Sequence, residues 1–362
     1  MEIYCVGGSI RDILLDLPVH DNDYVVIGSN HTEMINQRFT VVGSGFPVYL
    51  HPITGDEYAL GRTETKIGVG YTGFATETEN VTLQDDLSRR DLCCNALAVR
   101  VEDWDKFIET KDESLVIDYF GGIGDLKTGV LRHINEDFAL DPVRILRVSR
   151  FSARYGFDVH PDTIELMSQI VPELSTVPQE RIWAEFEKGL NEKDPVKMFT
   201  VLVECGALNE DGPLAPYAHC DALTLNRVAK CAGDLTTRFV FVSKGFVLSD
   251  YERCRIPTEL TLVSYMFNSF KQSLMDYKHY SKEERLNVLD KMRAFSRPWL
   301  LDKCLYALSF CGQYIKVMET INKIRLDVET TKAVPAAEIA ATAKNGKEIK
   351  EKIFAARIAV MK

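Results

Sequence analysis

The sequence predicts an α+β protein in which a small mixed sheet is followed by helices. Over about the first 135 residues, short apolar runs bounded by glycines alternate with short helical patterns. After Glu136 the pattern is almost wholly helical. At 362 residues the chain exceeds one ordinary core, so we expect two or three domains.

Runs of β-branched and aromatic residues predict strands at residues 3–6, 21–27, 40–42, 47–50, 57–60 and 116–119. Asp141-Pro142 is typical of a helix start and predicts a helix to about Tyr155. Ser281 opens a capping box before another helix. Helical patterns also cover residues 178–190, 195–204, 301–324 and 336–361, and the apolar stretch 260–270 is expected to be core.

The net charge of −10 argues against a nucleic-acid partner, but this charge is unevenly distributed. Residues 332–362 carry seven Lys or Arg and three Glu. This basic segment could contact a phosphate backbone or could be a solvated helix face, and its charge leaves both interpretations open.

The chain has no run of about 18 uninterrupted apolar residues, and its N-terminus lacks the basic and apolar regions of a secretory signal. Its nine cysteines form no C-x-x-C pair, so we expect reduced, buried thiols rather than disulfides or a zinc site. These features predict a cytoplasmic protein without a membrane partner.

Asp21 and Asp23 lie two residues apart in a predicted strand, so both carboxylates point to one face. Strands disfavour Asp. Paired carboxylates suit two magnesium ions, one activating an attacking hydroxyl and one neutralising a triphosphate. The alternative is a charged strand start at solvent.

Gly7-Gly8 follows the first predicted strand and precedes a helix start. Such a turn lets the backbone approach a phosphate closely, and a helix N-terminus favours negative charge. Arg11, one turn further, could pair with a triphosphate. An ordinary tight turn with a solvated arginine is the alternative.

Arginines dominate two further motifs. Arg89-Arg90-Asp91 suits ribose and phosphate contacts, or it is an exposed salt-bridged helix start. Four arginines share about a third of the circumference of one predicted helix: Arg144, Arg147, Arg150 and Arg154. These like charges require an anion or carboxylates. A nucleotide is one such anion, and few acidic residues are nearby in the sequence.

Asp141 and Arg144 lie one helical turn apart. An acceptor and a donor at this spacing could together read the Watson–Crick edge of a base.

The order and spacing of these motifs resemble class II tRNA nucleotidyltransferases, the bacterial-type CCA-adding enzymes of the poly(A) polymerase superfamily. The resemblance is close from residue 1 to about 208 and partly returns near residue 332. It is carried by Gly7-Gly8-x-x-Arg11-Asp12, Asp21-x-Asp23, Arg89-Arg90-Asp91, Asp141-x-x-Arg144 and Gln179-Glu180-Arg181-Ile182.

The resemblance implies a five-stranded nucleotidyltransferase-type catalytic head at 1–138, a helical neck with the nucleotide-selecting motif at 139–208, and a helical body and tail for tRNA binding at 209–362. It implies magnesium at Asp21 and Asp23 and base selection by Asp141 and Arg144. The other implied nucleotide contacts are Gly8, Arg11, Arg90, Arg147 and Arg150.

Further implied roles fall outside the catalytic motifs. Arg181 and Glu180 would brace the neck helix, and residues 65–75 would be the family's flexible segment. The tail would meet the tRNA, with phosphate contacts at Lys344, Lys347, Lys350 and Lys352.

Two departures from the family pattern stand out. Leu140 occupies the position of a usual Glu, which we expect to loosen the orientation of the base-reading pair. After Gly206 the chain has only His219 and His279, so we expect no C-terminal His-Asp phosphohydrolase activity.

The expected activity is sequential transfer of CMP, CMP and AMP from CTP and ATP to a tRNA 3′ end, without a nucleic acid template. Glu57 or Asp86 would be a third catalytic carboxylate, and the sequence leaves that choice open. A poly(A) polymerase or a specialised CC-adding or A-adding enzyme is an alternative. Another is a catalytically silent RNA-binding module, against which the paired carboxylates argue.

Overall fold

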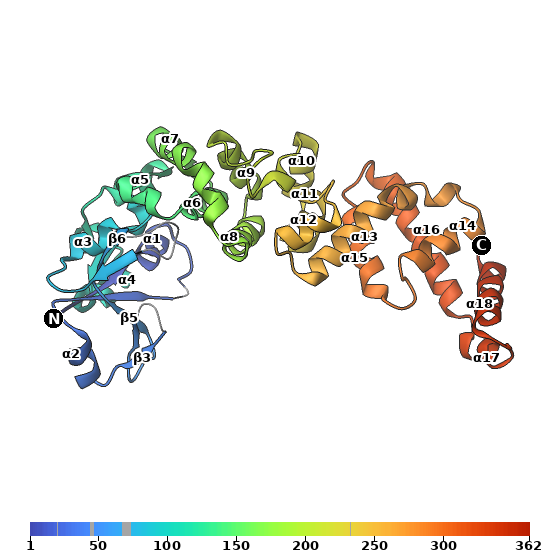
Figure 1. Ribbon diagram of the computed structural model, residues 1–362, viewed down its shortest axis with the longest axis horizontal. Helices are drawn as coiled ribbons and strands as arrows, with labels where there is room; N and C mark the ends of the chain where they lie inside the picture. Colours follow the sequence, from blue (N-terminus) through green and yellow to red (C-terminus); the bar gives the residue numbers. More distant parts are fainter. Residues whose placement is uncertain (20, 44–46, 67–73, 232) are drawn as a thin grey trace. The chain divides into compact units, whose positions relative to one another are not determined.

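The computed structural model of the chain describes residues 1–19, 21–43, 47–66, 74–231 and 233–362. The chain forms two compact units, Met1–Pro213 and Leu214–Lys362. Within the described residues, every strand belongs to the first unit, and the second unit is helical (Figure 1). The predicted α+β class, a mixed sheet followed by helices, is confirmed.

The main sheet of the first unit has the strand order β3-β4-β5-β2-β1-β8-β9. Its strands are β1 (Glu2–Val6), β2 (Asp23–Ile27), β3 (Thr40–Val42), β4 (Val48–Leu50), β5 (Glu57–Leu60), β8 (Leu97–Arg100) and β9 (Val116–Asp118). Strands β2 and β5 are parallel and the other neighbours are antiparallel, so the sheet is mixed. Over the described ranges, the sheet has seven strands rather than the expected five, with short strands at both of its edges.

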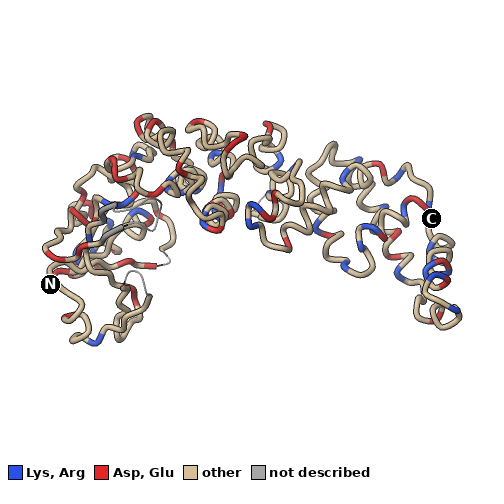
Figure 2. The backbone as a smooth tube through the Cα atoms, in the orientation of Figure 1, with Lys and Arg blue, Asp and Glu red and all other residues tan. Residues whose placement is uncertain are grey.

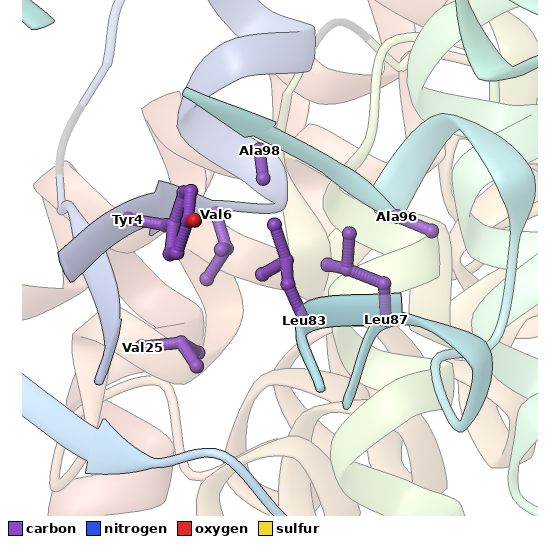
Figure 3. Packing of buried hydrophobic residues seen from close by; sticks show 7 residues of the cluster. All are labelled: Tyr4, Val6, Val25, Leu83, Leu87, Ala96 and Ala98. Carbon is purple, nitrogen blue, oxygen red and sulfur yellow. The ribbon is translucent and has the colours of Figure 1, made fainter. Parts of the chain in front are cut away.

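The centre of this sheet is buried on both faces. Tyr4, Val6 and Val25 face the same side as Ala98 and pack with helix α3 (Leu83–Ser88) through its leucines (Figure 3). Cys5 alternates with these residues and is also buried. A sheet covered in this way is a rigid platform for side chains at the ends of its strands.

Two smaller sheets and further helices complete the first unit. The sheets pair β6 (Thr63–Lys66) with β7 (Phe74–Glu77) and β10 (Val130–Leu131) with β11 (Asp158–Val159). The helices are α1 (Gly8–Leu14), α2 (His31–Asn36), α4 (Trp104–Thr110), α5 (Gly122–Thr128), α6 (Arg144–Tyr155), α7 (Pro161–Ile170), α8 (Gln179–Asn191) and α9 (Pro195–Glu204). Helix α6 packs against both α8 and α9.

The second unit consists of α10 (Ala222–Lys230), α11 (Leu235–Val242), α12 (Leu248–Arg253), α13 (Thr258–Met275), α14 (Lys282–Lys291), α15 (Pro298–Leu308), α16 (Tyr314–Lys332), α17 (Ala336–Ala341) and α18 (Gly346–Val360). The capping box predicted at Ser281 is confirmed. Helix α13 buries Leu260, Val263 and Phe267, as expected of a core segment. Within the part of the chain that the structure describes, no helix combines the length and hydrophobicity needed to cross a membrane.

Several predicted boundaries differ from those observed. The single helix predicted over 301–324 is broken before α16, where Gly312 has φ +91°, and the pattern over 336–361 forms two helices, α17 and α18. Strand β2 begins at Asp23, so Asp21 lies just before the strand. Helix α6 begins at Arg144 rather than at Asp141-Pro142. Residues 67–73 of the segment 65–75 lie outside the described residues.

Candidate active site

A cavity of about 550 Å³, which we call the arginine cavity, lies within the first unit. Eight arginines and four acidic residues contribute to its lining, so the cavity is strongly electropositive. The charged lining consists of Arg11, Arg89, Arg90, Arg144, Arg147, Arg150, Arg154, Arg181, Asp23, Asp91, Asp141 and Glu185. Such a balance suits a ligand with several negative charges, as a nucleoside triphosphate has.

The arginine cavity brings together side chains from distant parts of the sequence. Of the predicted site residues, it is lined by Gly8, Arg11, Asp23, Arg90, Asp141, Arg144, Arg147 and Arg150. Asp21 is not part of the lining and lies two residues before Asp23. The roles of these residues stay predictions, but their meeting in one cavity is what a shared ligand requires.

The register of β2 and β5 places two carboxylates side by side at the first residues of these strands. Asp23 of β2 pairs with Glu57 of the parallel strand β5, and paired residues project from the same face. Asp21, Asp23 and Glu57 are exposed. Toward the residues that the structure describes, neither Asp21 nor Asp23 makes a hydrogen bond or ion pair, so both carboxylates have oxygens available for a ligand.

Asp86, the other candidate for a third carboxylate, is fully buried. It accepts a hydrogen bond from the Arg62 backbone N–H at 3.2 Å and pairs with Arg89 at 2.7 Å and Arg90 at 3.5 Å. Burial opposes its ionisation, but the two guanidinium groups outweigh burial and hold the pKa of Asp86 below its usual value. Asp86 therefore organises these arginines, and Glu57 is the candidate that lies beside Asp23.

The Gly7-Gly8 turn allows a close approach of the Arg90 side chain. Gly7 has φ +83°, a conformation that L side chains rarely adopt. A Cβ atom on Gly7 would lie 2.7 Å from Nη1 of Arg90. Helix α1 begins at Gly8, which contributes to the cavity lining. The glycine thus sets the position of an arginine as well as the path of the backbone.

Arg11 is buried, so a solvated arginine at this position is excluded. Its Nε donates to Oδ1 of Asp12 at 2.8 Å, and its Nη1 donates to Oδ1 of Asn95. The guanidinium carbon lies 5.3 Å from the ring centroid of Phe151 and 4.9 Å from that of Tyr155 on α6. These contacts fix Arg11 in the cavity wall.

The arginine stripe of α6 is balanced by carboxylates that are distant in the sequence. Arg147 donates from Nε to Asp91 at 2.8 Å, and Arg150 donates from Nε to Glu185 of α8 at 2.7 Å. Arg154 pairs with a third carboxylate, that of Asp12, at 3.2 Å. Few acidic residues lie near these arginines in the sequence, but the fold brings carboxylates to three of them, so the stripe is salt-bridged, which the sequence had disfavoured.

Asp91 is the most buried of these balancing groups. Burial opposes its ionisation, but the Arg147 guanidinium and the Asn95 amide outweigh burial and hold the pKa of Asp91 below its usual value. Asp91 in turn contributes to a raised pKa of Arg147, although burial alone would lower it. The pair is therefore ionised at neutral pH.

Asp141 and Arg144 both line the cavity at the start of α6. Oδ2 of Asp141 accepts from Nη2 of Arg181 at 2.8 Å, and Oδ1 accepts from the Val143 backbone N–H at 3.2 Å. Arg144 donates to the backbone carbonyl oxygens of Asp137 at 2.9 Å and of Arg89. Both side chains are thus held in place by polar contacts from the protein.

Asn95, Phe151 and Glu185 are among the residues of the arginine cavity that the sequence did not predict. Asn95 and Phe151 carry no local signal, because an isolated amide and an apolar helix residue are both common in cores. Glu185 follows Arg181 by one turn of α8, and this spacing could have indicated a shared helix face.

Among the described residues, no cysteine lines the arginine cavity, although Sγ of Cys94 lies 3.8 Å from Oδ1 of Asn95, which does. All nine are free, and eight are buried. Burial raises the pKa of Cys93 and of Cys94 to about 12. These thiols are therefore protonated and unreactive at neutral pH.

Two family models match the first unit. Residues 3–132 match the poly A polymerase head domain, and residues 156–213 match the probable RNA and SrmB-binding site of polymerase A. Together the two matches cover most of the unit that contains the arginine cavity.

Curated relatives match the same part of the chain. The multifunctional CCA protein of Nitrosomonas eutropha is 53% identical over 212 residues, which are 58% of this chain and 48% of the relative. That of Neisseria meningitidis serogroup A is 51% identical over 211 residues, again 58% of this chain and 48% of the relative. The chain thus spans about half the length of these relatives.

Solved structures resemble the chain over almost its whole length. A CCA-adding enzyme in an apo form matches with a TM-score of 0.69 and 21% identity over 98% of this chain and 88% of that one. The CCA-adding enzyme of Bacillus stearothermophilus in complex with CTP matches with a TM-score of 0.67 and 22% identity over 99% and 88%. At this identity the likeness establishes a shared fold.

Proposed function

The chain carries a poly(A) polymerase head domain followed by an RNA-binding segment of the same family, and on this premise we propose that it adds CCA to the 3′ end of tRNA. The substrates would be CTP and ATP, and pyrophosphate would be released. The similar proteins are described as CCA proteins and CCA-adding enzymes, which supports this activity over others of the same superfamily.

One observation carries the proposal most directly. The arginine cavity combines a carboxylate of the sheet, Asp23, with phosphate-binding groups and with the Asp141 and Arg144 pair. A nucleotidyltransferase needs a reacting centre, a triphosphate site and a means of choosing the base, and the cavity offers a candidate for each. An RNA-binding module would need only the positive charge.

Magnesium fits the donor set of Asp21 and Asp23. Mg²⁺ is usually held by one or two carboxylates together with substrate phosphates and water. Within the described residues no group of three or more His, Cys, Asp or Glu could hold a metal ion by itself, so the nucleotide would have to complete the coordination. When bound, the ions would activate the tRNA 3′-hydroxyl and neutralise charge on the triphosphate.

The chain's own residues would bind and orient the two substrates. Gly8 and the arginines Arg11, Arg90, Arg147 and Arg150 would hold the triphosphate. Asp141 and Arg144 would pair with the base and select C and then A. Catalysis would consist mainly of positioning and charge neutralisation at the α-phosphate. We propose the same division of the chain as above: head at 1–138, neck at 139–208, and body with tail at 209–362.

The second unit would hold the tRNA. In the described part of the C-terminal segment, lysines and glutamates alternate along α18 (Figure 2), with Lys352 pairing with Glu348 at 2.9 Å and Lys347 with Glu351 at 3.9 Å. Lys344 and Lys350 are the other candidates for phosphate contacts. A cytoplasmic location agrees with the free thiols.

A single incubation tests the proposed function. The protein is mixed with Mg²⁺, labelled CTP or ATP, and tRNA lacking its terminal CCA. CTP alone should extend the tRNA by two nucleotides, and CTP with ATP should extend it by three. A long adenosine tract would identify a poly(A) polymerase, addition of C or A alone would identify a specialised enzyme, and binding without addition would contradict all of these activities.

A further inference from the structure

A continuous series of hydrogen bonds and ion pairs begins and ends on helix α6. It passes through the loop around the 3-10 turn Cys93–Asn95 and through helix α1. Its members, in order, are Arg147, Asp91, Asn95, Arg11, Asp12 and, back on α6, Arg154 with Tyr155. We call this series the α6 clamp.

Asn95 is the only neutral side chain between the two charged halves of the α6 clamp. Its Nδ2 donates to Oδ1 of Asp91 at 2.8 Å, and its Oδ1 accepts from Nη1 of Arg11. An ionised carboxylate can only accept and a guanidinium can only donate, so the amide orientation is fixed by its neighbours. An Asp at this position would repel Asp91. An apolar residue would remove one hydrogen-bond partner from each neighbour, leaving Asp91 with Arg147 and Arg11 with Asp12.

Asp12 is the second anchor of the α6 clamp. One oxygen accepts from Arg154 at 3.2 Å, and the other accepts from the Tyr155 hydroxyl at 3.1 Å. Asp12 is itself 7% exposed, so these contacts are largely shielded from water. Burial raises the pKa of Tyr155, so its hydroxyl remains a donor.

The two anchors are widely spaced along α6. Arg147 and Arg154 are seven residues apart, which corresponds to about 10 Å along a helix axis. Attachment at two levels restrains both the rotation and the height of the helix relative to the sheet. Arg144 lies at the first residue of the same helix, one turn before Arg147.

We propose that Asn95 is a positioning residue for base selection, through which the α6 clamp holds Asp141 and Arg144 at the correct place above a nucleotide bound by the head. This inference rests on the proposed function. Asn95 joins the loop that follows Arg90 to helix α1, so its loss would uncouple the two anchors of α6 from each other although each anchor remains.

The test compares nucleotide choice in the full-length protein and in Asn95→Leu. Leu has the same number and branching of side-chain heavy atoms, although it is larger, and it can neither donate nor accept. With tRNA lacking CCA, we expect the ratio of kcat/KM for CTP to that for UTP to fall at least tenfold, with the KM for CTP raised. This ratio is independent of the fraction of folded protein, so a merely structural role would leave it unchanged.

Asn268→Leu is the matched control. The Asn268 amide of α13 is partly buried and donates to the Val240 carbonyl oxygen at 3.2 Å and to Ser264 Oγ at 3.3 Å, in the second unit. We expect the Tm of Asn268→Leu to fall by about as much as that of Asn95→Leu. Its CTP-to-UTP ratio of kcat/KM should equal that of the wild type.

A wild-type ratio in Asn95→Leu would overturn the inference. If Asn95→Leu does not fold, Asn95→Asp decides, because it keeps the acceptor for Arg11 but places a like charge against Asp91. The same loss of discrimination in Asn95→Asp would support the inference, and wild-type discrimination would overturn it. Wild-type protein that adds no nucleotide would instead contradict the proposed function.

Discussion

Arg181 donates a hydrogen bond from Nη2 to Oδ2 of Asp141 at 2.8 Å, which joins helix α8 to the segment that leads into α6. The other oxygen of Asp141 accepts from a backbone N–H. The preceding residue is Leu140, which cannot orient a neighbouring side chain by hydrogen bonding. Among the contacts of the described residues, the direction of the Asp141 carboxylate therefore depends on Arg181 and the backbone.

Arg181→Ala should reduce base discrimination more than it reduces catalysis. Loss of one hydrogen bond between charged groups costs about 1.5–3 kcal/mol, so the CTP-to-UTP ratio of kcat/KM should fall by roughly tenfold or more. The measurement is competitive incorporation into tRNA lacking CCA. Arg181→Lys should have a CTP-to-UTP ratio between those of Arg181→Ala and the wild type. An unchanged ratio in Arg181→Ala would show that Arg181 does not hold Asp141 in place for base selection.

Asp21→Asn and Asp23→Asn should each abolish nucleotide addition. The neutral amide keeps the shape of the carboxylate but is a much poorer ligand for Mg²⁺, so we expect a loss of roughly 10³-fold or more in kcat. Binding of tRNA, measured by gel shift, should be retained. Asp16→Asn is the control, because this carboxylate is 81% exposed and pairs with Lys111 at the surface. Near-normal turnover in either site variant would exclude that residue as a metal ligand.

Gly7→Ala should destabilise the first unit and also displace Arg90. The positive φ costs about 1–3 kcal/mol for a non-glycine residue, and the added Cβ would lie 2.7 Å from Nη1 of Arg90. We expect a lower Tm and a raised KM for CTP. Gly55→Ala separates these effects, because Gly55 has φ +76° with no atom near its Cβ position. A raised KM in both variants would mean that backbone strain alone is responsible.

Asp91→Asn should change how the free energy of unfolding depends on pH under acidic conditions. The folded pKa of Asp91 is lowered, so its charge stabilises the protein above the unfolded pKa of about 3.9, and this contribution is lost as the pH falls through the folded pKa. The difference in unfolding free energy between wild type and variant should be constant above about pH 5 and narrow below about pH 4.

Urea denaturation at several pH values checks this prediction. A Trp299→Phe background removes the one tryptophan of the second unit, so that Trp104 and Trp183 report on the first. A difference that stays constant down to pH 3 would show that Asp91 is not the group responsible.

Local pattern predicted much of the fold. Strands 40–42 and 57–60 and helix 195–204 have their predicted bounds, because a glycine follows each strand and Pro195 opens the helix. The break between α15 and α16 was missed, because the apolar periodicity continues across Gly312 and only its positive φ reveals the turn.

The sequence predicted many residues of the candidate site but not the ion pairs and hydrogen bonds between them. Gly8, Asp23 and the arginines could be nominated because each belongs to a short motif. The partners of the arginines could not, since Asp12 and Glu185 reach α6 only through tertiary packing. The pairing of Glu57 with Asp23 and the burial of Asp86 likewise follow from tertiary structure and could not be predicted from the sequence.

The parallel pairing of β2 with β5 has a consequence for synthesis of the protein. Strand β1 pairs with β2 over a short antiparallel connection, but β5 reaches β2 only after residues 28–56 have been made. Arg147 and Arg150 leave the ribosome almost a hundred residues later still. A nascent chain therefore carries Asp23 and Glu57 well before the arginines of α6 that line the same cavity as Asp23. Completion of α6, rather than closure of the sheet, is the step that supplies half of the arginines of the cavity, and that of α8 follows.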